Sequence, residues 1–310
     1  IFHLPIHNLP IDAFGIALCH TMFNIIATAI LMPNGKLIIK LTEWLTREKG
    51  TPAQEDTAAT IGALDDRLLR SPSVAVRESF NYTTQMCATA HKTLRKAFHL
   101  LDEYSEDQAQ AVVEEEDIID LYEDRLGTFL VRLSSRELSS GDSHAVSLML
   151  HSIGDFERLG DHAVNIQKVA EEMWEKRLTF SQEARQELDV LLAAIEEILQ
   201  LTEEAFTKRD LSIAAQVEPL EQVVDKLIAK IKDHHIDRLT RGECTIEMGF
   251  ILSDLLNNCE RVSDHCSNIA VALIEVEHNS FDTHKYLNDV KYGSADFAAA
   301  FAAFAGKYAL

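Results

Sequence analysis

Apolar residues recur along most of the chain with the spacing of an α-helix. The clearest example has 4-3-4-3 spacing, which places one apolar stripe on one face of a helix. Its members are Leu188, Leu192, Ile195, Leu199 and Thr202. The pattern continues from about residue 73 to about residue 280 and predicts six long helices. The breaks between them fall near Tyr104-Ser105, Ser140-Gly141, Phe180-Ser181, Arg209-Asp210 and Arg241-Gly242.

The N-terminal stretch has a different pattern. The twenty residues from Ala13 to Met32 contain no Asp, Glu, Lys or Arg, which is the length that a helix needs to cross a bilayer. A buried helix of a soluble core is the alternative, because His20 and Asn24 lie one turn apart. Basic residues follow from Lys36, and basic flanks lie on the cytoplasmic side of a membrane. We therefore expect a transmembrane helix in the cell inner membrane, with the residues from about 36 onward in the cytoplasm.

A composition change separates this stretch from the helical region. Residues 46–72 mix Gly, Pro, Thr and charged residues with weak periodicity, which is typical of a linker. The chain opens with Ile1 rather than Met, so we expect it to be a fragment whose upstream part is missing. Residues 1–45 would then be the end of a transmembrane domain.

Overall composition excludes several classes of protein. With 46% hydrophobic residues but only 12 Gly and 6 Pro, the chain favours an all-α fold. The formal net charge of −21 repels phosphate backbones, so we expect no nucleic-acid partner. Five cysteines without a C-x-x-C pair argue against a disulfide framework and a zinc knuckle, and they favour a reducing compartment.

One polar motif occurs twice. FERLGDHAVNI at 156–166 and CERVSDHCSNI at 259–269 share Glu-Arg-x-x-Asp-His-x-x-Asn-Ile at an offset of 103 residues. A shorter Glu-x-x-x-Asp motif also occurs twice upstream, at an offset of 105 residues. Such a long period indicates a duplicated three-helix domain rather than a solenoid. We expect two tandem homologous three-helix bundles at 73–178 and 181–280, followed by a tail helix within 281–310.

The paired acids are candidate metal ligands. Glu and Asp four residues apart lie on one helix face and repel each other, so a positive group should neutralise them. Four carboxylates converge if the two motif helices of a repeat lie side by side, and oxygen ligands suit iron, manganese, magnesium, calcium or oxygen-coordinated zinc. The candidate ligands are Glu116, Asp120, Glu157, Asp161, Glu221, Asp225, Glu260 and Asp264.

Two other interpretations of these acids stay open. They could form a purely structural network with Arg158 and Arg261, or a solvated charged face. His162 and His265 follow the motif aspartates and could either ligate a metal or hydrogen-bond to its ligands. Asn165 and Asn268, one turn further on, are expected to hydrogen-bond between helices.

With two sets of three helices and doubled E-x-x-x-D and E-R-x-x-D-H-x-x-N-I motifs, the chain resembles the PhoU family of phosphate-signalling proteins. The resemblance covers about residues 73–280 and implies regulation of phosphate uptake. It also implies multinuclear iron or zinc clusters on the carboxylate faces. One cluster would use Glu116, Asp120, Glu157 and Asp161, and the other Glu221, Asp225, Glu260 and Asp264.

The ends of the chain suggest a narrower relative. Residues 17–33 resemble the last membrane segment of bacterial type II sodium-dependent phosphate cotransporters, and residues 283–293 and the final KYAL are similar to their ending. The duplicated Gln-Ser-Ser motifs of that family's transport site are absent. We expect a cytoplasmic regulatory domain of a sodium/phosphate cotransporter. The alternative is a free-standing regulator that docks on another transporter or a kinase. Expected partners are the membrane, sodium and inorganic phosphate through the missing transport core, and further copies of the chain.

Enzymatic activity is not expected. A di-iron oxidase needs two Glu-x-x-His motifs, and only Glu275-x-x-His278 is present; no P-loop occurs either. The tail carries an aromatic stripe that we expect to pack on the bundle or on a neighbouring subunit, rather than on a membrane surface. Its members are Phe297, Phe301, Phe304 and Tyr308.

Overall fold

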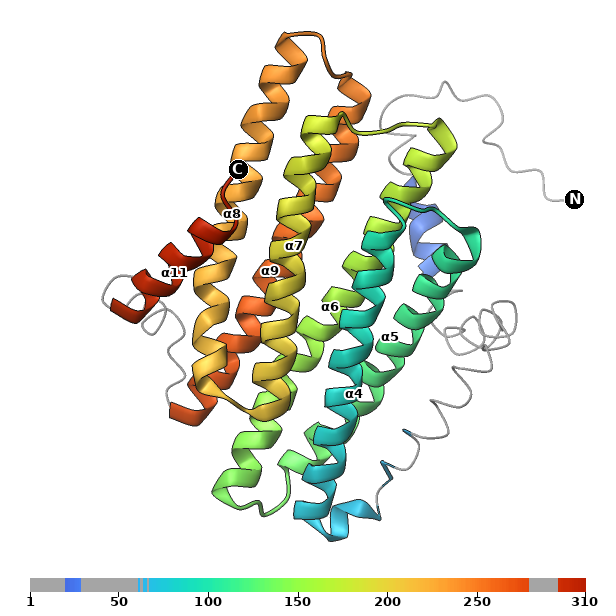
Figure 1. Cartoon of the computed structure of the whole chain (residues 1–310). Helices are drawn as coiled ribbons and strands as arrows, with labels where there is room; N and C mark the ends of the chain where they lie inside the picture. Colours follow the sequence, from blue (N-terminus) through green and yellow to red (C-terminus); the bar gives the residue numbers. More distant parts are fainter. Residues whose placement is uncertain (1–19, 29–60, 62–63, 66, 279–294) are drawn as a thin grey trace, which may run out of the picture. The chain divides into compact units, whose positions relative to one another are not determined.

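The computed structural model describes residues 20–28, 61, 64–65, 67–278 and 295–310 (Figure 1). The chain divides into two units, Ile1–Gly50 and Thr51–Leu310. Every regular element in the described residues is helical, which confirms the predicted all-α class. The elements of the second unit are η1 (Leu68–Arg70), α4 (Pro72–His99), α5 (Glu106–Ser134), α6 (Ser140–Lys176), α7 (Gln182–Lys208), α8 (Leu211–Thr240), α9 (Ile246–His278) and α11 (Ala295–Lys307).

The first unit is described only at residues 20–28, which form a helix. Its polar pair lies on one face, where the Asn24 amide is 3.4 Å from the His20 ring. No helix among the described residues is long and apolar enough to span a membrane.

The predicted inner-membrane location is therefore wrong. The cytoplasmic placement of the residues from about 36 onward stays a prediction. The remainder of the predicted segment 13–32 lies outside the described residues.

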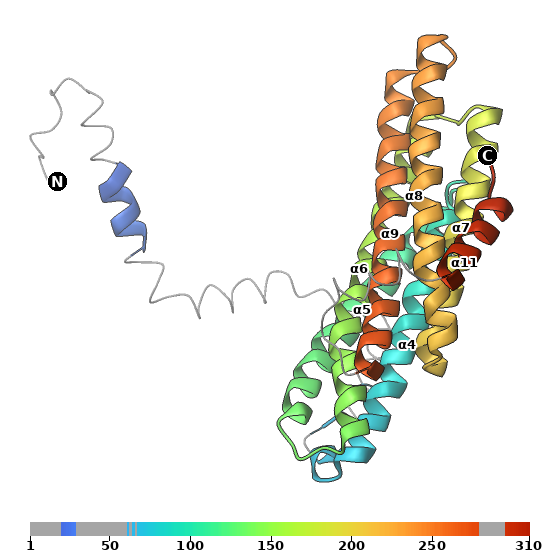
Figure 2. The ribbon, with the colours of Figure 1, turned by 90° about the vertical axis from the view of Figure 1, so that its left-hand side faces the viewer.

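Helices α4 to α9 form two sets of three. Within each set every helix contacts the other two, and the sets meet where α6 packs on α9 and α4 packs on α7 (Figures 1 and 2). The sequence repeat relates α4 to α7 and α6 to α9, so the two sets are joined through equivalent helices. The predicted limits of the two repeats stay a prediction.

Aromatic side chains fill the junction between the sets. The Phe206 ring of α7 meets Phe156 of α6 edge-to-face, with ring centroids 5.0 Å apart, and stacks on Phe80 of α4 at 5.5 Å. Phe156 and Phe206 are fully buried. The two sets consequently share one continuous hydrophobic core.

The helix ends near the predicted breaks are stabilised by local hydrogen bonds. The side chain of Ser181 accepts a hydrogen bond from the Ala184 amide at 3.2 Å, and Asp210 accepts one from Ser212 at 2.8 Å. Such N-caps satisfy free amides of the first turn. Arg177 and Arg209 end α6 and α7 in the left-handed conformation, with φ of 55° and 54°.

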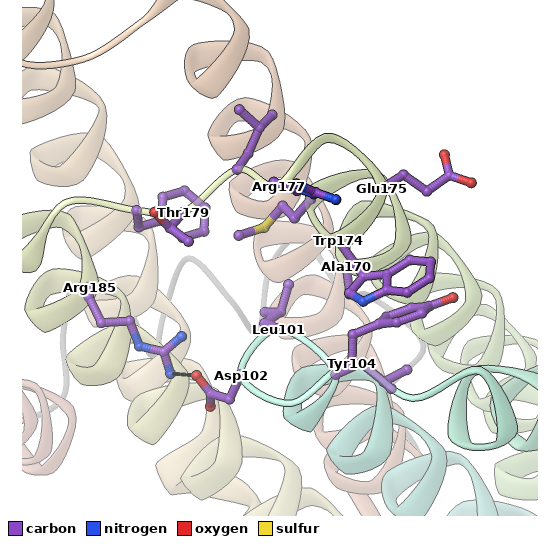
Figure 3. A pocket seen from close by; sticks show the side chains of 13 residues that line it. Leu101, Asp102, Tyr104, Ala170, Trp174, Glu175, Arg177, Thr179 and Arg185 are labelled. Carbon is purple, nitrogen blue, oxygen red and sulfur yellow. Dashed lines mark ion pairs between the residues drawn. The ribbon is translucent and has the colours of Figure 1, made fainter.

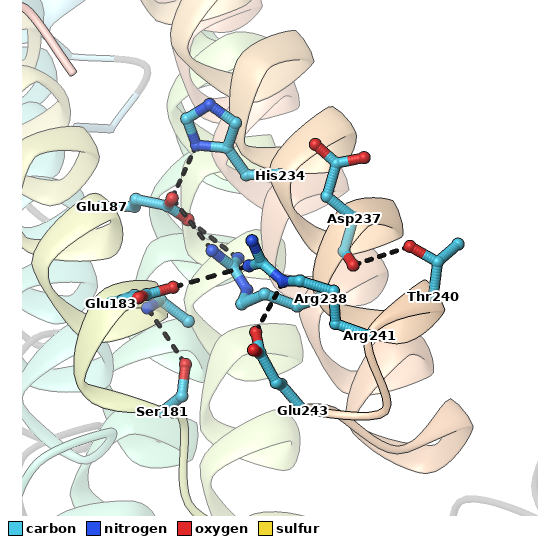
Figure 4. Close-up of polar contacts among 10 residues, drawn as sticks. Ser181, Glu183, Glu187, His234, Asp237, Arg238, Thr240, Arg241 and Glu243 are labelled. Carbon is cyan, nitrogen blue, oxygen red and sulfur yellow. Dashed lines mark hydrogen bonds and ion pairs between the residues drawn. The ribbon is translucent and has the colours of Figure 1, made fainter.

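An ion-pair cluster braces α7 against α8 (Figure 4). Arg238 donates two hydrogen bonds to the Glu187 carboxylate at 2.9 and 2.8 Å, and His234 contacts the same group at 2.6 Å. Burial acts to raise the pKa of Glu187, but hydrogen bonds from Arg238 and His234 outweigh it and hold this pKa below its ordinary value. The cluster lies at the end of the second set, where Arg241 also pairs with Glu243 at 2.8 Å.

The tail helix α11 packs on the second set. Tyr308 donates to Glu197 of α7 at 2.6 Å, and the Lys226 ammonium of α8 lies 4.0 Å from the centre of the Phe301 ring. Phe297 and Tyr308 are buried. Packing on the bundle, the first of the predicted alternatives, is what the structure shows.

Candidate functional site

The two copies of the repeated motif face each other across the α6–α9 contact. His162 of α6 donates from Nδ1 to Asn258 of α9 at 2.9 Å, and His265 of α9 donates to Asp155 of α6 at 2.8 Å. The two rings lie 5.5 Å apart. Along α6 the pairs run from Asp155 to His162, whereas their partners on α9 run from His265 back to Asn258, so α6 and α9 are antiparallel. Asp155 and Asn258 occupy matched positions of the repeat.

These contacts give the motif histidines a role between the repeats. Burial lowers the pKa of His162, and the nearby His265 adds to that effect, against an opposing contribution from the hydrogen bond to Asn258. Asn268, expected to hydrogen-bond between helices, lies 3.3 Å from Asp155 of the other motif helix. The sequence could not reveal these partners, because they depend on how the two repeats dock.

The acids of the first repeat gather between α5 and α6. Burial and then the charges of Asp120, Asp117, Asp161 and Glu157 raise the pKa of Glu116 to about 7. These charges come from both α5 and α6, so carboxylates of the two helices lie close to one another. The close packing of the helices is shown at Gly160, where an added Cβ would lie 3.1 Å from Ile119.

The pKa values of two neighbouring acids are raised as well. Burial, followed by the charge of Asp161, raises the pKa of Asp120, and the same two causes raise the pKa of Glu157. Arg158 lies at this face, 2.9 Å from Asp161 and 3.4 Å from Glu157. The predicted pairing of Arg158 with the acids is therefore present.

An open hollow of about 730 Å³ lies beside this face. Its walls include acids that lie outside the repeated motifs. The lining residues are Asp120, Glu123, Asp124, His151, Gly154, Asp155, Glu157, Arg158 and His265. Glu123 and Asp124 follow Asp120 by three and four residues, which is the helical spacing that could have found them.

The second repeat presents a different environment. Arg261 lies 3.1 Å from Asp264, as Arg158 does from Asp161. In addition, the Lys232 ammonium of α8 lies 3.5 Å from the Glu260 carboxylate. Glu221 and Asp225 lie on α8, and each takes part in an interaction. The second face therefore has a lysine beside one of its motif acids.

As they stand, no three Asp, Glu, His or Cys side chains in the part of the chain that the structure describes are placed to hold a metal ion. Carboxylates without a cation repel one another, and Arg158 already engages Asp161 at 2.9 Å. The donor chemistry of the first repeat still fits a hard cation, since it supplies several crowded oxygen ligands. The second repeat does not fit a cation in the same way, because the ammonium of Lys232 lies beside Glu260.

A second hollow, of about 800 Å³, lies where the ends of α4 and α6 meet the α6–α7 connection. Figure 3 shows the stacked rings of Tyr104 and Trp174, whose centroids are 4.9 Å apart, and the ion pair of Asp102 with Arg185. Its walls are mostly apolar. It therefore lacks the oxygen-rich lining of the carboxylate face.

Comparison with known proteins identifies both repeats. The family model described as PhoU domain matches residues 83–170 and 188–273, which together are more than half of the chain. The PhoU homolog 1 of Thermotoga maritima, a phosphate-specific transport system accessory protein, is 23% identical over 213 residues, covering 68% of this chain and 90% of the relative. The corresponding homolog of Clostridium acetobutylicum is 24% identical over 196 residues, covering 61% and 86%.

Solved structures agree on the fold. PhoU from Pseudomonas aeruginosa matches with a TM-score of 0.61 at 22% identity, covering 68% of this chain and 99% of that chain. The regulatory protein PhoU of the phosphate transport system from Streptococcus pneumoniae matches with a TM-score of 0.59 at 20% identity, covering 68% and 98%. At these identities the likeness shows the shared helical fold.

Proposed function

Because the chain belongs to the PhoU domain family, we propose that it is a regulatory protein of phosphate transport and that it acts by binding rather than by catalysis. The observation that carries this proposal is that both repeats match the domain model over residues 83–170 and 188–273. Its relatives are named accessory proteins of phosphate-specific transport systems. A regulator of this kind shifts its target between states through different affinities for those states.

Metal binding at a carboxylate face is the second part of the proposal. Glu116, Asp120, Glu157 and Asp161 would hold the cation, with iron or zinc as the first candidates and manganese, magnesium or calcium as alternatives. The bound metal would supply positive charge to acids that otherwise repel one another. The raised pKa of Glu116, about 7, supports this because burial, the largest cause, and then the neighbouring negative charges both disfavour its ionised form.

The narrower hypothesis joins the domain to a sodium/phosphate cotransporter. It rests on residues 17–33 and 283–293, most of which lie outside the described residues. A regulator that docks on a separate transporter or kinase makes the same predictions for the helical bundle. The cotransporter attachment, the sodium and phosphate partners and the homo-oligomer therefore stay predictions.

Phosphate uptake by cells tests the regulatory role. The host is a bacterium whose own PhoU-family regulator has been deleted, carrying either this chain or an empty vector. Uptake of labelled phosphate is measured at low and high external phosphate, and the chain should restore the dependence of uptake on external phosphate. Equal uptake with chain and vector, at matched protein levels on immunoblots, would contradict the proposed function.

A further inference from the structure

The two carboxylate faces differ at one matched position that decides the local charge. Position 127 of α5 and position 232 of α8 both lie eleven residues after the first acid of their motif. The first repeat has Gly127 there, and the second has Lys232, whose ammonium lies 3.5 Å from Glu260. Glu157 is the matched acid of the first repeat, so the lysine has no counterpart there.

Position 127 borders the acidic face. A Cβ added to Gly127 would lie 3.9 Å from the carboxylate of Glu123 and 3.6 Å from Ile153. Both distances are ordinary van der Waals contacts, so a side chain can start there without displacing its neighbours. Glycine is the worst helix former after proline, so helix stability does not explain its presence at this site.

Other matched positions differ in the same direction. Four acids on or beside the first carboxylate face are replaced by uncharged residues in the second repeat. The pairs are Asp117 and Gln222, Glu123 and Ile228, Asp124 and Ala229, and Asp155 and Asn258. The arginines of the motif are common to both repeats, at 2.9 Å and 3.1 Å from their aspartates, so they do not distinguish the faces.

From these differences we infer that the first repeat alone takes up the cation, and that Lys232 serves as a built-in positive charge that closes the second face to metal. This inference rests on the metal binding in the proposed function. A divalent ion at the second face would meet fewer carboxylates and the repulsion of a fixed ammonium. At the first face, crowded carboxylates and an open hollow of about 730 Å³ favour entry of the ion.

Manganese(II) bound by the purified full chain tests the inference. After equilibrium dialysis, bound manganese per chain is measured by elemental mass spectrometry. The Asp120→Asn/Asp161→Asn variant should lose the bound metal, whereas the Asp225→Asn/Asp264→Asn variant should keep the wild-type amount. Circular dichroism verifies that both variants fold.

A charge transplanted into the first repeat gives a sharper test. Gly127→Lys places an ammonium where the second repeat has one, and should weaken manganese binding by about tenfold or more. Gly127→Gln adds a side chain of similar size without charge and should bind like the wild type. Both replacements improve helix propensity, so loss of folding does not explain a loss of metal.

The outcomes separate this inference from the proposed function. Metal lost in the Asp225→Asn/Asp264→Asn variant, or full binding by Gly127→Lys, would overturn the inference while leaving metal binding intact. A wild-type chain that binds no manganese, iron or zinc in the same dialysis would overturn both the metal part of the proposed function and the inference. The phosphate-uptake assay still tests regulation independently.

Discussion

Replacing Glu116 by glutamine should stabilise the metal-free protein at high pH. The pKa of Glu116 is raised to about 7 from an ordinary value of 4.5. In the folded state the carboxyl group therefore holds its proton to a higher pH than in the unfolded state. Stability is highest below pH 4.5, falls as the pH rises through the window from 4.5 to 7, and carries the full cost of the charged form above it.

The size of this effect follows from the shift. At 1.36 kcal/mol per pKa unit, the rise from 4.5 to about 7 corresponds to about 3.4 kcal/mol of unfolding free energy, which is an upper limit. Glu116 is only partly buried, and solvent screening reduces the expected cost to about 1–2 kcal/mol. Glu116→Gln has the same shape without the charge, so it should gain this amount at pH 8 and much less at pH 5.

Urea unfolding followed by circular dichroism, with a chelator present, measures the difference. The midpoint of Glu116→Gln should exceed that of the wild type at pH 8, and the two should approach each other at pH 5. Glu137→Gln, at an exposed position after α5, is the matched control and should unfold like the wild type at both pH values. A Glu116→Gln variant no more stable than the wild type at pH 8 would refute the electrostatic crowding of the first repeat.

Two further predictions concern the ion pair of α7 with α8 and the packing of glycines in α9 and α6. Arg238→Ala leaves the Glu187 carboxylate without its bidentate partner and should cost about 3 kcal/mol in urea unfolding at pH 7; a loss below about 1 kcal/mol would contradict the brace. Gly249→Ala places a Cβ 2.8 Å from Nε2 of the buried His235 and should lower the melting temperature, at a cost of about 1–3 kcal/mol. Gly154→Ala, with no atom within 4 Å of the added Cβ, should instead stabilise by about 0.5–1 kcal/mol, and equal melting temperatures for the two variants would contradict the packing argument.

Periodicity predicted the helices well because their stability depends on local pattern and a buried face. In the stripe on α7, Leu188, Ile195, Leu199 and Thr202 are buried, and only Leu192 is partly exposed. The predicted breaks fall at or near the helix ends, where Ser181 and Asp210 cap the next helix. Local signals of this kind are readable without knowledge of the tertiary fold.

The partners of the candidate site were not readable in the same way. His162 and His265 each bond to the opposite repeat, 96 and 110 residues away along the chain. The pairing of Lys232 with Glu260 likewise depends on how α8 lies against α9. The motif identified which residues carry the chemistry, whereas helix packing decides which of them meet.

The N-terminal prediction has a different outcome. The segment from Ala13 to Met32 has no formal charge but includes His20 and Asn24 on one face. No described helix is both long and apolar enough to cross a bilayer. Only residues 20–28 of this segment are described, and the rest of it lies outside the described residues.

Phosphate uptake by cells carrying acid-to-amide variants tests the central claim most directly, namely that the first carboxylate face is the functional one of two. In the host without its own PhoU-family regulator, the Asp120→Asn/Asp161→Asn chain should behave like the empty vector. The Asp225→Asn/Asp264→Asn chain should regulate uptake like the wild type at equal protein levels. Regulation retained by the first variant and lost by the second would contradict the claim.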